Sequence, residues 1–182
     1  GHQSIFGSSF SSVTVNSGAT LDMADKGMST VIPLTLNGVG VNGVGALIKT
    51  LGSGHSTWAG TITLGSATLV SNISNSPYYI YIGGVGSSVT SAGFDLTVNG
   101  ASNFGNGATI NLGAGSLTKT GDGALTIFKS NNTIDGGVFV YGGSVTMAST
   151  GTYTNPLGSG AITVNGGSLE LNTSSQIASS VT

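Results

Sequence analysis

The stretch from Gly115 to Met147 constrains the fold more than any other part of the chain. It holds short runs of alternating apolar and polar residues at 117–119, 124–128, 138–141 and 144–147. Between these runs stand Gly-Asp-Gly, Asn-Asn, Asp-Gly-Gly and Gly-Gly, which tolerate positive φ angles and close tight turns. Strands and turns this short leave no room for a helix, so the stretch predicts an all-β fold.

The same strand–turn phrase recurs in looser form along the whole chain. VTVNSGATL, LTVNGAS, VFVYGGSVTM and ITVNGGSLEL are variants of it, and GALIKT at 45–50 mirrors GSLTKT at 115–120. Looser copies cover 12–23, 45–70, 94–112 and 161–171. The irregular spacing favours one parallel β-solenoid domain over residues 1–182, with roughly eight rungs of about 20–25 residues each. Asn at the corners would hydrogen-bond between rungs, and a β-sandwich or jelly roll is the structural alternative.

Charged residues make up only 5% of the sequence, and the net charge is −2. There is no Arg, so no basic stripe could neutralise phosphates, and we expect no nucleic-acid partner. A surface of Ser, Thr and Asn has little like-charge repulsion, which favours self-association. No apolar run is long enough to span a bilayer, so we expect no membrane insertion.

Acidic residues do not gather at the spacing that catalysis or metal binding needs. Asp22 and Asp25 form the one close pair, and a hard cation requires several more oxygen ligands. Asp122 and Asp135 each stand beside Gly, where turn chemistry explains them. A carbohydrate-active β-helix would need acids converging on one face. We therefore expect no catalytic residue.

Cysteine is absent, and the two histidines, His2 and His55, have no acidic partner at ligand spacing. No phosphate-binding glycine loop is present either. The sequence therefore indicates neither a metal site nor a cofactor.

Aromatic residues offer the best candidates for contact with a ligand or a neighbouring molecule. Alternation through 78–82 places Tyr79 and Tyr81 on the face opposite the isoleucines. If the isoleucines are core, both tyrosines project outward and could stack on sugar rings or anchor a neighbouring subunit. Trp58 is a third candidate, and a purely structural role is the alternative for all three.

At Gly115 to Met147 the sequence resembles the autotransporter-associated β-strand repeat, also called the passenger-associated transport repeat. The strict match covers about a fifth of the chain and departs from the usual Asn-Thr-Tyr phrase at Ile134. The resemblance implies a right-handed parallel β-helix that acts as a stalk or secretion scaffold in bacterial surface and secreted proteins, with no catalytic residues. The residues that carry it are Leu117, Thr118, Lys119, Thr120, Gly121, Gly123, Leu125, Thr126, Ile127, Gly136 and Gly137, with the V-x-V-x-G-G-x-V run that follows.

Open ends of a solenoid expose unpaired backbone groups, which invite further strands. SSVT occurs at both 11–14 and 179–182, which suggests that one copy abuts the next. We expect an extracellular or cell-surface structural subunit that assembles head to tail into a bacterial fibre or stalk. An adhesin or glycan-binding passenger fragment, contacting glycans or a host or cell surface, is the second hypothesis, and the carbohydrate-active enzyme is the third. The apolar residues assigned to the assembling ends are Ile5, Phe6, Phe10, Ile177 and Val181.

Overall fold

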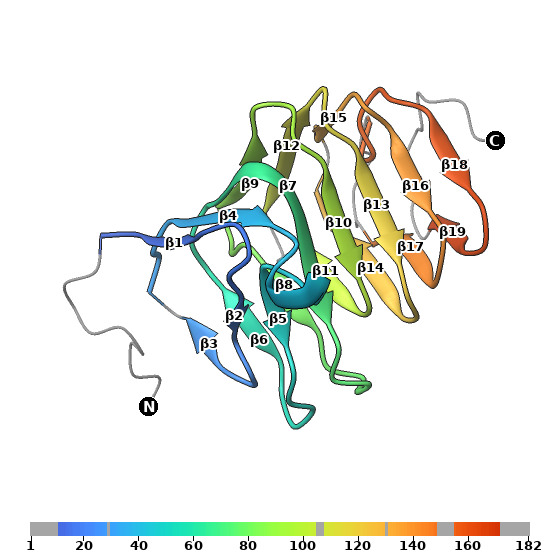
Figure 1. The fold of residues 1–182 in the computed structure, drawn as a ribbon. Coiled ribbons are helices and arrows are strands. Elements are labelled where there is room, and N and C mark those ends of the chain that lie inside the picture. The colour runs from blue at the N-terminus through green and yellow to red at the C-terminus, as the bar shows by residue number, and fades with distance from the viewer. Residues whose placement is uncertain (1–10, 29, 105–107, 130, 149–154, 172–182) are drawn as a thin grey trace.

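The structure, a computed structural model, describes residues 11–28, 30–104, 108–129, 131–148 and 155–171. These residues coil into an all-β parallel solenoid of about six rungs (Figure 1). Every pairing between described strands is parallel. Sandwiches and jelly rolls are built from antiparallel strands, so that alternative is wrong.

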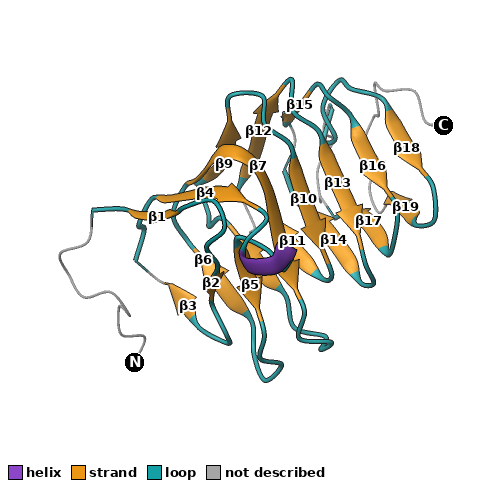
Figure 2. Ribbon diagram, in the orientation of Figure 1, coloured by secondary structure: helices purple, strands orange, loops and turns teal. Residues whose placement is uncertain are grey.

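The strands lie on three faces of the solenoid, with short loops at the corners (Figure 2). The first face contains β1 (Val13–Val15), β4 (Leu34–Gly38), the first part of β7 (Ile62–Asn72), β9 (Ser88–Ser91), β12 (Thr109–Gly113) and β15 (Thr133–Ile134). The second contains β2 (Leu21–Asp22), β5 (Leu47–Lys49), the second part of β7, β10 (Leu96–Asn99), β13 (Leu117–Thr120), β16 (Val138–Val140) and β18 (Ile162–Val164).

The third face is a separate seven-stranded sheet. A short 3-10 helix, η1 (Val41–Gly43), occupies one corner and is drawn in purple in Figure 2. The strands of the third face are β3 (Gly27–Met28), β6 (Ser56–Trp58), β8 (Ile80–Ile82), β11 (Ser102–Phe104), β14 (Ala124–Ile127), β17 (Ser144–Met147) and β19 (Ser168–Leu171).

Alternate residues of each strand point inward and stack in rows along the solenoid axis. On the second face Leu96, Leu117, Val138 and Ile162 occupy one row, and each is at most 1% exposed. Thr97, the next residue along its strand, is half-buried and points outward. This two-residue period produces one hydrophobic core that continues through the described rungs.

The number of rungs is about six, so the expected eight is too many. Successive strands of the third face start 20 to 29 residues apart, and the longest interval, from Gly27 to Ser56, contains η1 and a projecting loop. The expectation also divided the whole chain into rungs, including residues 1–10 and 172–182, which lie outside the described residues.

The two mirrored phrases at 45–50 and 115–120 do not occupy equivalent positions in their rungs. Leu47 shares a row with Lys119, whereas the phrase alone would align it with Leu117. The phrases are therefore displaced by two residues. Because side chains alternate with a period of two, this displacement keeps every inward residue inward.

Asn side chains bridge neighbouring rungs as expected, and those of Asn37 and Asn132 do so through bonds to the backbone. Asn37 Nδ2 donates to Val15 O at 2.9 Å. Asn132 is buried, accepts from Ile110 N at 2.8 Å and donates to Pro156 O at 2.6 Å. One amide thereby connects three successive rungs.

Gly60 stands where two rungs approach too closely for a side chain. A Cβ built at Gly60 would lie 1.9 Å from Ile32 O, whereas one at Gly27 would have Thr57 Cβ at 3.8 Å as its nearest neighbour. Neither glycine has a positive φ angle, so the difference between them is one of space alone.

We predict that Gly60→Ala lowers the free energy of unfolding by about 1–3 kcal/mol, the usual cost of overpacking. Gly27→Ala, the matched control, should change it by no more than about 0.5 kcal/mol, apart from a small gain through the unfolded chain. Urea unfolding followed by circular dichroism measures both variants, and equal stabilities would contradict the close approach.

Candidate functional site

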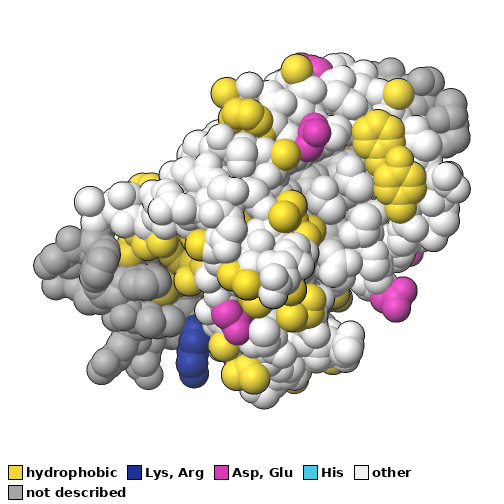
Figure 3. Space-filling view, in the orientation of Figure 1, with side chains coloured by type: hydrophobic (Ala, Val, Ile, Leu, Met, Phe, Trp, Pro, Cys, Tyr) yellow, Lys and Arg dark blue, Asp and Glu magenta, His cyan; other side chains and the backbone are white. Residues whose placement is uncertain are grey.

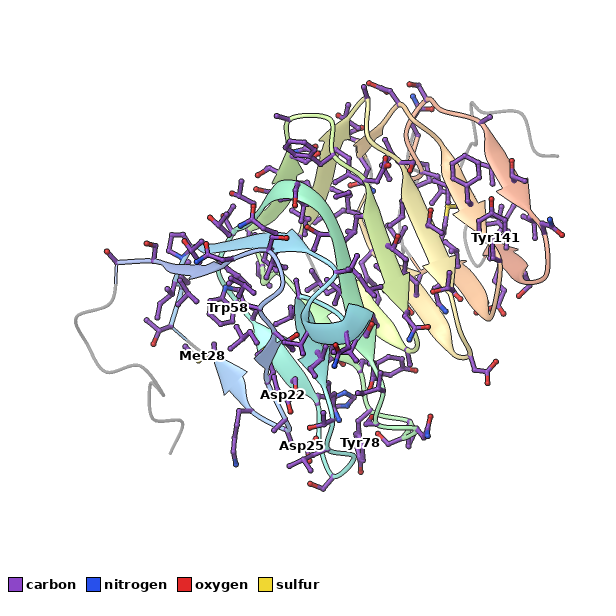
Figure 4. All side chains as sticks on the ribbon, viewed as in Figure 1. Asp22, Asp25, Met28, Trp58, Tyr78 and Tyr141 are labelled. Carbon is purple, nitrogen blue, oxygen red and sulfur yellow. The ribbon has the colours of Figure 1, made fainter. Side chains whose placement is uncertain are left out.

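Trp58 lies in the core. It follows Thr57 on β6, pairs with Ile82 and Met28 across the third face, and is 1% exposed (Figure 4). Its Nε1 donates to Ile32 O at 2.9 Å. The expectation that Trp58 offers a ring to an external ligand is therefore wrong, because the alternation of β6 turns this side chain inward.

Tyr79 and Tyr81 belong to a group of rings that we call the aromatic cluster: His55, Tyr78, Tyr79 and Tyr81. The His55 ring stacks on Tyr79, with centroids 5.6 Å apart and planes 3° from parallel. It meets Tyr78 edge-on at 5.1 Å and Tyr81 at 5.1 Å. The cluster lies on the projecting loops 50–55 and 73–79 and on the outer side of β8, where Figure 4 labels Tyr78.

Strand β8 explains most of this arrangement. Ile80 and Ile82 are 0% and 1% exposed, while Tyr81 between them is half-buried and faces outward, as alternation predicts. Tyr78 precedes the strand and contacts His55 instead of joining the isoleucine row.

Sequence reasoning missed His55 as a member of this cluster. Ser56 pairs with Ile80, so His55 and Tyr79, which directly precede these two residues, also lie side by side. Tyr79 N donates to His55 Nδ1 at 3.0 Å, so the neutral ring carries its hydrogen on Nε2. From the sequence, the contact between His55 and Tyr79 could have been predicted only by knowing that this rung is 24 residues long, from Ser56 to Ile80.

A groove of about 670 Å³ runs along the corner between the second and third faces. The loop 73–76 forms one side, and the turns that contain Gly100 and Gly121 form the other. Asn99 and Asp122 line it as well. Its polar amide and carboxylate groups can exchange hydrogen bonds with the hydroxyls of a bound molecule.

Lys49 is fully buried at an earlier position of the same corner. Its Nζ lies 2.8 Å from Asp25 Oδ1 and also donates to Leu51 O. The hydrogen bonds from Lys49 and from Ser53 hold the pKa of Asp25 well below its ordinary value. Asp25 thus connects the loop 50–55 to the preceding rung through these hydrogen bonds.

Lys119 is the second buried lysine, and no carboxylate of the described residues is in hydrogen-bond contact with it. Its stem stands in an inward row between Val98 and Val140. Its Nζ donates to Thr120 O at 2.6 Å, Gly121 O at 2.7 Å and Gly142 O at 3.4 Å. Burial lowers the pKa of Lys119 to about 8, against a smaller opposing effect of the Asp122 charge.

Four further carboxylates, those of Asp22, Asp95, Asp135 and Glu170, also connect neighbouring rungs. Asp22 accepts from Thr50 Oγ1 at 2.6 Å, whereas Asp25 accepts from Lys49 and Ser53, so the two carboxylates have different partners. Asp95 accepts from both the amide and the hydroxyl of Ser116 at 2.8 Å. Thr146 Oγ1 donates to Glu170 at 2.9 Å, and Ser159 donates to Asp135. Within the described ranges, no group of three or more His, Asp or Glu side chains could hold a metal ion.

The apolar residues assigned to the assembling ends, Ile5, Phe6, Phe10, Ile177 and Val181, lie outside the described residues. Of the two SSVT segments, 11–14 leads into β1, which pairs with β4, and 179–182 lies outside the described residues.

No family model, no curated protein and no solved structure matches the chain. In the part of the chain that the structure describes, no helix is long and apolar enough to cross a membrane.

We predict that folding stability depends on pH through Lys119. Between pH 8 and 10.5 the unfolded lysine holds its proton while the folded one loses it, so the free energy of unfolding rises with pH across this window. Lys119→Met keeps the apolar stem and removes the titrating group, so the rise should disappear.

Lys129→Met, at an exposed lysine, is the matched control and should retain the rise. Urea unfolding across this pH range measures the difference between the two variants. A rise that persists unchanged in Lys119→Met would contradict the assignment.

Proposed function

We propose that the chain is a non-enzymatic structural module of a bacterial extracellular fibre or surface stalk, which assembles head to tail through the ends of its solenoid. The observation that carries the proposal is the parallel backbone pairing of every rung along one axis. Strands β1 to β3 lie at one end and β18 and β19 at the other, so the two ends differ, as head-to-tail assembly requires (Figure 1).

The use of charged side chains supports a structural role. Asp22, Asp25, Asp95, Asp135 and Glu170 each accept hydrogen bonds from residues 21 or more positions away in the chain. Charged side chains are sparse and scattered on the face that Figure 3 shows. The likeness of 115–147 to the autotransporter-associated repeat points the same way, toward a bacterial stalk.

The β19 end offers a specific edge for assembly. Among described strands β19 pairs with β17 alone, and β3 at the other end pairs with β6 alone. Ser168 N donates to Gly143 O on the β17 side. Backbone groups alternate along a strand, so the amide of Leu171 points away from β17.

We predict unbranched fibres with an axial repeat of about 30 Å per chain, from about six rungs at about 4.8 Å each. Leu171→Pro removes one outward donor while sparing the bonds to β17, so it should shorten or abolish the fibres. Leu171→Ala, the control, keeps the donor and should polymerise normally. Negative-stain electron microscopy measures the fibre length of both variants. Fibres of unchanged length in Leu171→Pro would count against assembly through this edge.

The aromatic cluster favours a second function, glycan binding by an adhesin. Its rings are at least partly exposed, and those of His55, Tyr78 and Tyr79 stand on loops that project from the solenoid, beside the polar groove. Ring faces stack on sugars, and the amides of the groove suit sugar hydroxyls.

For this second function we expect binding on a glycan array that Tyr79→Ala and Tyr81→Ala each weaken about tenfold. Tyr141→Ala, at a 50% exposed tyrosine on the second face, is the control and should bind as the parent does. An array on which the parent chain binds no glycan would rule out this candidate and leave the fibre proposal untouched.

A further inference from the structure

A row of threonines runs across the outside of the first face. Thr14 pairs with Thr35, Thr35 with Thr63, and Thr63 with Thr90. The row continues through Asn111 to Thr133. Five of its six positions are therefore threonine, and we call it the threonine row.

A second row of hydroxyls runs beside the first on the three central strands. Thr109 pairs with Ser88, and Thr61 precedes Ile62, the partner of Val89, so Thr61 lies beside Ser88. All three are half-buried on the outer side. Together the rows form a grid of hydroxyl groups two residues wide.

The composition of the threonine row is not a general property of outward positions in this solenoid. The equivalent row on the second face contains Leu69 and Phe139 among its threonines. The row on the third face contains Tyr81 and Glu170. Strand propensity alone would favour threonine equally on all three faces, so it does not account for the difference.

The grid repeats in two directions at distances that the backbone sets. Neighbouring strands lie about 4.8 Å apart, and alternate residues of one strand lie about 6.6 Å apart. The strand spacing is close to the shorter oxygen repeat on a prism face of hexagonal ice, and the spacing along the strand is somewhat below the longer one. The hydroxyl oxygens of Thr63 and Thr90 stand 3.5 Å apart, which is closer than their backbones and at the limit of a hydrogen bond between them, so one water molecule can contact both.

The electrostatic character of the grid also fits an uncharged lattice. Neither row contains a charged residue, although acids and lysines occur at the corners. Each threonine offers a hydroxyl that donates and accepts and a methyl group that restricts neighbouring water. Because β4, β7, β9 and β12 are each hydrogen-bonded to a strand on both sides, the positions of the groups that they carry are preorganised before any contact.

We propose that the first face binds ice, holding lattice water through the threonine row and the hydroxyls beside it. The occupant is an ordered water surface, since an uncharged grid with a fixed two-dimensional repeat complements an uncharged crystal. This function is independent of fibre assembly and uses a different surface from the solenoid ends.

The test measures inhibition of ice recrystallisation, and the shaping of a single ice crystal, by the monomeric fraction of the purified chain. The parent chain should inhibit crystal growth. Thr63→Tyr places a bulky ring in the centre of the grid and should require about tenfold more protein for the same inhibition.

Thr118→Tyr is the matched control on the second face, where Phe139 already occupies the next position of its row. It should inhibit as the parent does, and thermal unfolding should show that both variants fold.

A parent chain without effect on ice, or an equal loss of inhibition in both variants, would overturn the proposal. Binding to crystalline cellulose without any effect on ice would also overturn it and identify a crystalline polysaccharide as the partner. Fibre formation is scored separately with Leu171→Pro, so the two proposals fail independently.

Discussion

Parallel hydrogen bonding between successive rungs is the interaction on which the rest of the molecule depends. It places each residue directly above its counterpart in the rung before, about 4.8 Å away, so side chains meet in rows of matched position. Apolar rows such as Leu96, Leu117, Val138 and Ile162 gain from this arrangement because each member buries its neighbours.

The same stacking explains why the chain carries so little charge. Two like charges in neighbouring positions of a row would repel each other at short range. The structure instead pairs carboxylates with hydroxyls, as in Asp22 with Thr50 and Glu170 with Thr146. Lys119 instead has its amine inside the corner, where it donates to backbone carbonyls, and burial lowers its pKa to about 8.

The fold class could be predicted from sequence because alternation and glycine turns are local signals, and the inward position of Ile80 and outward position of Tyr81 followed from the same pattern. The burial of Trp58 could not, because a run of three residues in β6 does not show which side of the strand faces the core. The place of His55 in the aromatic cluster depends on the length of one rung, which only the pairing of Ser56 with Ile80 reveals. The number of rungs failed for a related reason, since projecting loops consume residues without adding strands.

The displacement of the mirrored phrases at 45–50 and 115–120 has a consequence for how such a chain can change during evolution. Leu47 and Lys119 share a row although their phrases are out of step by two residues, and the core remains closed. Duplicated segments can therefore be displaced relative to each other by an even number of residues and still turn the same side chains inward. The corner loops accommodate the difference in length. A gene encoding such a solenoid can gain or lose copies by unequal recombination at many breakpoints, while a breakpoint that shifts a strand by one residue turns its apolar side chains toward water.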